Sequence, residues 1–127
     1  MKQHTPGPWF IWKERAMQDE GDLETQEISE ELSEYESFEV MAGEPIGKVT
    51  RSSIRGCKTI TEIDSINFGE SEDEGRQIAL ANARVIAAAP ELLEVLKSAV
   101  SVAEMRDGKE DGWVEQARAA IAKATNE

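Results

Sequence analysis

The feature that most constrains the fold is a change of hydrophobic period at Ser71. Before this residue, apolar and polar residues alternate over short runs, which is the pattern of β-strands with one buried face. After it, apolar residues recur every three or four positions, which is the pattern of helices with one buried face. Because the strand-like runs all precede the helical ones, the sequence predicts an α+β fold rather than a chain of βαβ units.

Four strand-like runs lie before the change of period. Each is short and bounded by turn residues, and the short connections between most of them favour antiparallel pairing. The sequence therefore predicts a small antiparallel sheet of about four strands. The runs are PWFIWK at 8–13, SFEVMA at 37–42, EPIGKVTR at 44–51 and GCKTITEIDSI at 56–66.

The first of these runs is apolar on both faces. Trp9 and Ile11 lie on one face, and Phe10 and Trp12 lie on the other. This arrangement is typical of a strand that is covered on two sides or that lies at an oligomer contact.

An acidic segment separates the first two runs. Residues 18–36 carry nine acidic side chains, and no basic residue occurs between Arg15 and Lys48. Apolar residues at 28, 32 and 35 have the spacing of a turn or two of helix. Like charges such as those of Glu27 and Glu31 oppose that helix by a few tenths of a kcal/mol per pair. We interpret 18–36 as a mobile insertion between strands, partly helical.

Residues 71–127 are predicted to form two or three helices. Ser71, with Glu74 three positions later, is a capping box that begins the first helix. Proline costs about 3 kcal/mol inside a helix but is favoured at the first position of one. We therefore expect a second helix to begin at Pro90, with a bend there, and a short last helix over 113–125.

The length of the chain predicts one domain over residues 1–127, since domains most often have roughly 100–150 residues. In this domain 1–70 are mainly β, with the acidic insertion at 18–36, and 71–127 are helical.

Composition excludes several classes of function. A net charge of −12 repels nucleic-acid phosphates and anionic membranes, so we expect neither as a direct partner. His4 and Cys57 are the only residues of their types, which leaves no disulfide, no zinc motif and no Ser-His or Cys-His pair typical of a catalytic site. We expect no catalytic residue, metal or cofactor, and no enzyme activity.

No apolar run approaches the roughly 20 residues of a membrane span, and the N-terminus lacks the apolar core of a signal peptide. The expected location is the host cytoplasm.

Two segments together resemble a known group of proteins. HTPGPW at 4–9 and NARVIAAAPELLEVL at 82–96 resemble a family of small bacteriophage and prophage proteins, which close with a helical hairpin of the NARLIAAAPELL type. The expected sheet-then-helices architecture is similar to that of the Thoeris anti-defence sponges, which sequester cyclic ADP-ribose signals and cyclic oligonucleotides without cleaving them. The resemblance implies an anti-defence protein that holds a nucleotide immune signal between the protomers of a homo-oligomer.

Five residues are candidates for the contacts of such a ligand. Asn82 interrupts an apolar stripe, so it either bonds a strand backbone or recognises a ligand, because a buried polar group without a partner costs roughly 1–3 kcal/mol. Arg76 and Arg84 offer guanidinium groups to a phosphate, or else pair with local carboxylates. Phe68 and Trp9 either stack on a base or pack in the core.

The acidic segment supports a different hypothesis, in which the protein imitates a nucleic acid. An inhibitor of this kind covers a basic surface of a host defence complex, as anti-CRISPR and anti-restriction proteins do. The residues expected to bind this partner are Glu27, Glu30, Glu31 and Glu34. A phage accessory protein with an unrelated binding role is the third hypothesis.

Overall fold

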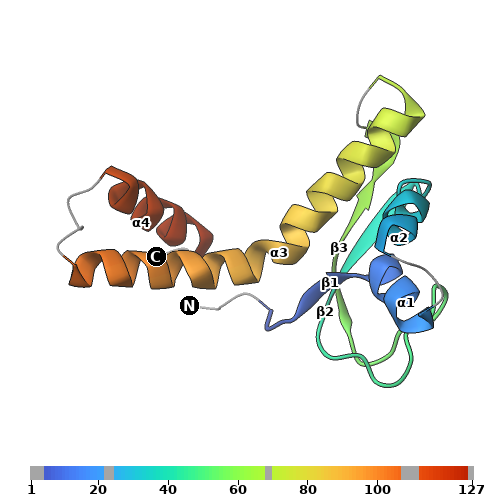
Figure 1. Cartoon of the computed structure of the whole chain (residues 1–127), viewed down its shortest axis with the longest axis horizontal. Coiled ribbons are helices and arrows are strands. Elements are labelled where there is room, and N and C mark those ends of the chain that lie inside the picture. Colours follow the sequence, from blue (N-terminus) through green and yellow to red (C-terminus); the bar gives the residue numbers. More distant parts are fainter. Residues whose placement is uncertain (1–4, 22–24, 68–69, 107–111, 126–127) are drawn as a thin grey trace. The chain divides into compact units, whose positions relative to one another are not determined.

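The structure is a computed structural model, and it describes residues 5–21, 25–67, 70–106 and 112–125 (Figure 1). The contacts within the chain divide it into two compact units. The sheet unit comprises Pro6–Ala88, and the hairpin unit comprises Met1–Thr5 and Ala89–Glu127. Each unit is described by itself below.

The sheet unit contains three antiparallel strands in the order β1-β2-β3, formed by Trp9–Ile11, Ser37–Ala42 and Lys58–Asp64. β2 pairs with both neighbours, with Trp9 opposite Ala42 in the first ladder and Ser37 opposite Asp64 in the second. This sheet and the helices that follow it confirm the α+β prediction.

The number of strands is three rather than about four. The run at 44–51 is not a strand, because Pro45 cannot donate to a ladder and Gly47 has a φ of 76°. Val49 is nevertheless fully buried, and its N–H donates to Asp19 Oδ2 over 3.2 Å. The apolar residue that suggested a strand therefore packs from a loop.

The strand predicted over 8–13 ends at Ile11, where helix α1 (Trp12–Glu20) begins. Trp12 turns away from the sheet and donates from Nε1 to the carbonyl oxygen of Thr50 over 2.8 Å. Ala16 and Met17, one turn further along, are fully buried. The helix therefore exists because its middle packs in the core, a contact that the local alternation of the sequence does not reveal.

Helix α2 (Thr25–Leu32) lies within the acidic segment and confirms that this segment is partly helical. Leu32 is fully buried, and Ile28 and Tyr35 pack against the same core. Contacts join α1 to α2, which lie side by side in Figure 1. This part of the segment thus contributes to the core instead of standing apart as an inserted loop would.

The core of the sheet unit draws on both strands and helices. Full burial of a large apolar side chain contributes roughly 1.5–3 kcal/mol, so Met17, Leu32 and Phe38 are among its largest contributors. Small residues of α3 (Glu72–Met105) complete the cluster, which allows that helix to approach closely. The cluster consists of Ile11, Met17, Leu32, Phe38, Val40, Ala79, Leu80 and Ala83.

Helix α3 continues through Pro90, so the prediction that a second helix begins there is wrong. Proline removes one backbone hydrogen bond, but strong helix formers on both sides, among them Ala88, Ala89 and Leu92, favour continuing the helix. The division between the two units falls between Ala88 and Ala89, directly before this proline.

The hairpin unit combines the second half of α3 with α4 (Gly112–Thr125). Its buried residues are Val100, Val114 and Ala117, with Leu96, Ala103 and Ile121 packed around them. The two helices α3 and α4 agree with the prediction of two or three C-terminal helices.

Candidate functional site

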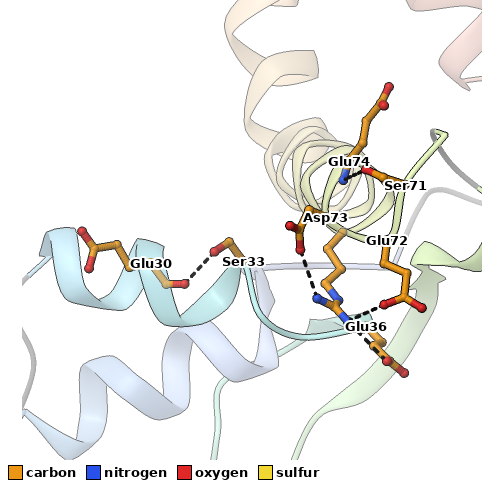
Figure 2. Close-up of polar contacts among 8 residues, drawn as sticks. Glu30, Ser33, Glu36, Ser71, Glu72, Asp73 and Glu74 are labelled. Carbon is orange, nitrogen blue, oxygen red and sulfur yellow. Dashed lines mark hydrogen bonds and ion pairs between the residues drawn. The ribbon is translucent and has the colours of Figure 1, made fainter.

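A pocket of about 430 Å³ lies in the sheet unit, where the start of α3 meets the ends of β2 and β3. Most of its charged side chains are carboxylates, and Arg76 supplies the one guanidinium among its lining residues. Figure 2 shows two of these carboxylates, those of Glu36 and Glu72, with Asp73 beside them. The residues that line it are Glu36, Asp64, Ser65, Ile66, Glu70, Ser71, Glu72 and Arg76.

Backbone hydrogen bonds fix the β2 and β3 side of this pocket. The N–H of Ser65 donates to the carbonyl oxygen of Glu36 over 2.8 Å, which joins the two chain segments directly. Asp64 Oδ1 accepts from the N–H of Ile66 over 3.0 Å and so turns the chain into the short 3-10 helix Ser65–Asn67. This turn ends β3 beside the start of β2.

The capping residues of α3 fix the opposite side. The N–H of Glu74 donates to Ser71 Oγ over 3.2 Å, as the predicted capping box requires. Glu74 Oε2 in turn accepts from the N–H of Glu70 over 3.4 Å. The cap therefore holds several carboxylates at the positive end of the helix dipole, which stabilises the helix.

Arg76 is surrounded by three carboxylates. Its Nη2 lies 3.6 Å from Glu36 Oε1 and 3.6 Å from Glu72 Oε2, and its Nη1 lies 3.3 Å from Asp73 Oδ1. The arginine side chain is 20% exposed while its partners are largely solvated, so each pair contributes at most about 1 kcal/mol. Of the two alternatives for Arg76, pairing with nearby carboxylates is the one observed.

The Nε of Arg76 is buried and has no hydrogen-bond partner within the described part of the chain. A buried donor without an acceptor costs roughly 1–3 kcal/mol. The guanidinium thus retains one unused donor beside the pocket.

The carboxylates around Arg76 outnumber its single positive charge. We call the three partners of Arg76, together with the other acidic residues of the pocket lining and the α3 cap, the acidic rim; it is formed by Glu36, Asp64, Glu70, Glu72, Asp73 and Glu74. All six residues are exposed. Because charges of one sign raise the local concentration of the opposite sign, the acidic rim attracts cationic groups and repels phosphates.

Acidic side chains of α2 and of the residues just after it are also exposed. Glu27, Glu30 and Glu34 are exposed, and Glu34 lies only two residues before Glu36 of the acidic rim. Glu31 differs from them because it is half-buried and forms an ion pair with Arg51. Three of the four carboxylates predicted to bind a basic partner are therefore open to solvent.

The five predicted ligand contacts are not brought together in the described residues. Arg76 lines the pocket, whereas Arg84 is exposed on α3 and Trp9 packs against the core. Asn82 is half-buried, and its separation of six residues from Arg76 places the two about 120° apart around the helix. Phe68 lies outside the described residues.

Sequence reasoning missed the acidic rim as a unit, because Glu36 and Asp64 are far from Arg76 along the chain. The density of acidic residues at 70–74 is a local signal of this surface, but by itself it indicates only a helix start.

The described residues were compared with the usual requirements of a metal site, a reactive thiol and a membrane helix. No group of three or more His, Cys, Asp or Glu side chains there is placed to hold a metal ion. Burial raises the pKa of the Cys57 thiol, with a further increase from Glu44, which lowers the fraction of reactive thiolate. None of the helices in these residues has both the length and the apolar character that a membrane crossing requires.

Comparison with known proteins gives one match. The model of the family described as Salmonella phage P22 protein Y8K6 matches residues 1–127. No curated protein and no solved structure matches the chain.

Proposed function

The chain belongs to the family of Salmonella phage P22 protein Y8K6, a phage protein family, and we propose that it acts by binding rather than by catalysis. Its partner is a basic surface of a host defence protein, and the acidic rim with the exposed face of α2 is the binding surface. The protein then competes with the nucleic acid that this basic surface normally holds.

The observation that carries the proposal is the surplus of exposed carboxylates around one already paired guanidinium. Residues 6–88 contain eighteen acidic and eight basic side chains. The negative electrostatic potential that results accelerates association with a basic partner and disfavours association with DNA, RNA or an anionic membrane.

The first prediction concerns the location of the binding charges. Glu70→Gln/Glu72→Gln removes two negative charges from the acidic rim and should weaken binding to a DNA-binding defence protein by about tenfold or more at low salt. The measurement is competition between the phage protein and labelled DNA for purified defence complexes, each assayed at low and high salt.

The matched control is Glu94→Gln/Glu115→Gln, which removes the same charge from the hairpin unit. A second test variant, Glu27→Gln/Glu30→Gln/Glu34→Gln, neutralises two exposed carboxylates of α2 and that of Glu34, which follows this helix. Equal binding by the rim variant and the control variant would contradict the proposal, as would binding that strengthens when salt is added.

A second candidate function is the sequestration of a nucleotide immune signal, and the unused Nε donor of Arg76 beside the pocket favours it. In this function Arg76, Asn82, Arg84, Phe68 and Trp9 contact the nucleotide, and protomers of a homo-oligomer enclose it.

The second prediction separates the two candidates. A ligand that binds only the folded state raises the melting temperature, by an amount that increases with its concentration above Kd. A sponge should therefore melt higher with a micromolar cyclic ADP-ribose isomer or cyclic dinucleotide, and Arg76→Gln should abolish the shift while Arg118→Gln, in the hairpin unit, retains it. No shift with any member of a cyclic-nucleotide panel rejects sequestration and leaves the acidic inhibitor.

A further inference from the structure

The hairpin unit exposes a line of apolar side chains on α3. Leu92 and Val95 are 57% and 67% exposed, and Ala99 and Val102 are also exposed. Their alternating spacing of three and four residues places them in one line along the helix, as in the contact seam of a coiled coil. We call these four residues the hairpin stripe. The residues packed against α4, such as Leu96 and Val100, belong to a neighbouring face.

A shallow apolar groove of about 510 Å³ runs beside the hairpin stripe. Three residues of the stripe line this groove, namely Val95, Ala99 and Val102. The rest of the lining includes Ala103 and Arg106, and Trp113 from α4. The alanines leave space in the groove, whereas Leu92 projects from the same unit. One hairpin thus offers both a recess and a side chain large enough to fill it, which is what a contact between two identical surfaces requires.

The charges at the two ends of the hairpin stripe are opposite in sign. Glu91 precedes the stripe and Arg106 follows it, about 22 Å away along the helix at 1.5 Å per residue. Both side chains are exposed, and neither forms an ion pair within the described residues. A second α3 running antiparallel places Glu91 against Arg106 at both ends, whereas a parallel one places like charges together.

The balance of charge also distinguishes this unit from the rest of the chain. Residues 1–5 and 89–127 contain eight acidic and six basic side chains, against eighteen and eight in residues 6–88. Two copies therefore repel each other strongly through their sheet units and only weakly through their hairpin units.

We propose that the hairpin stripe binds the hairpin stripe of a second copy of this chain, with the two α3 helices antiparallel. In this dimer Val95 lies opposite Val102, which is the register that also places Glu91 opposite Arg106. The contact turns two helical hairpins into a four-helix bundle, which is a stable way of covering such a face. It also adds to a hairpin core that has only three buried residues among those described.

The test is the oligomeric state of the full chain, measured by sedimentation equilibrium over a range of micromolar concentrations. The wild-type protein should be a dimer, and Val95→Glu should be a monomer over the same range. Val85→Glu is the matched control, because it makes the same change at an equally exposed position of α3 outside the hairpin stripe. Far-UV circular dichroism verifies that each variant keeps its helices.

Charge reversal tests the antiparallel register independently. Glu91→Arg and Arg106→Glu should each raise the dissociation constant by about tenfold, because each creates like-charged neighbours. The double variant should return to within a few-fold of the wild-type value. A wild-type monomer at every concentration, an equal effect of Val85→Glu and Val95→Glu, or a double variant weaker than both single variants would each overturn the proposal.

Discussion

At the scale of the residue, Arg76 is the positive charge that holds the start of α3 near the start of β2. Its partners Glu36, Glu72 and Asp73 would repel one another without it. We therefore predict that Arg76→Gln lowers the free energy of unfolding by about 1 kcal/mol at low salt, and by less at high salt, where the repulsion is screened. Urea unfolding at two ionic strengths measures both values. A loss that is independent of salt would assign the role of Arg76 to packing instead.

At the scale of the element, α3 keeps a proline in its interior. Pro90 cannot donate to the carbonyl oxygen of Ile86, and in a helix interior proline is about 3 kcal/mol less favourable than alanine. We predict that Pro90→Ala stabilises the protein by roughly 1–3 kcal/mol, measured as a higher urea midpoint. Ser101→Ala, an exposed change in the same helix, is the control and should add no more than about 0.5 kcal/mol. If Pro90 instead began a separate helix, its replacement would give no gain.

At the scale of the whole molecule, the two units share α3, and the hairpin unit has few buried residues of its own. Because helix formation is cooperative, unfolding of one end of α3 lowers the stability of the helix at its other end. The prediction of a single domain therefore leads us to expect one thermal transition in calorimetry, with equal calorimetric and van't Hoff enthalpies at a fixed protein concentration. Two separated transitions, one of which disappears when α4 is removed, would contradict it.

Prediction from sequence succeeded where the local pattern and the packing agree. β2 matches the predicted run 37–42 at both ends; burial alternates from Ser37 to Val40, and the last two residues are buried as well. Prediction failed at α1, where a strand-like run continues into a helix that long-range contacts of Trp12 and Met17 stabilise. It also failed at Pro90, where the preference of the surrounding residues for helix exceeds the effect of one proline.

The candidate site was less predictable than the fold, for a physical reason. The signs of the charges were visible in the sequence, and the pairing of Arg76 with nearby carboxylates was one of two alternatives considered. The proximity of Glu36 and Asp64 to α3 depends on the register between β2 and β3 and on the turn at Ser65. Neither the register nor the turn has a local signature strong enough to place Glu36 and Asp64 in the lining of one pocket with Arg76.

The burial of Leu32 in α2 limits how this protein can evolve. A purely inserted acidic loop could be lost from a phage genome by one deletion, with its negative charge and without damage to the rest of the fold. Here such a deletion also removes part of the core, so selection on folding preserves the helix whether or not its partner is present. The surface carboxylates do not have that restraint and can change one codon at a time, so the helix can persist in a lineage while its surface charge changes.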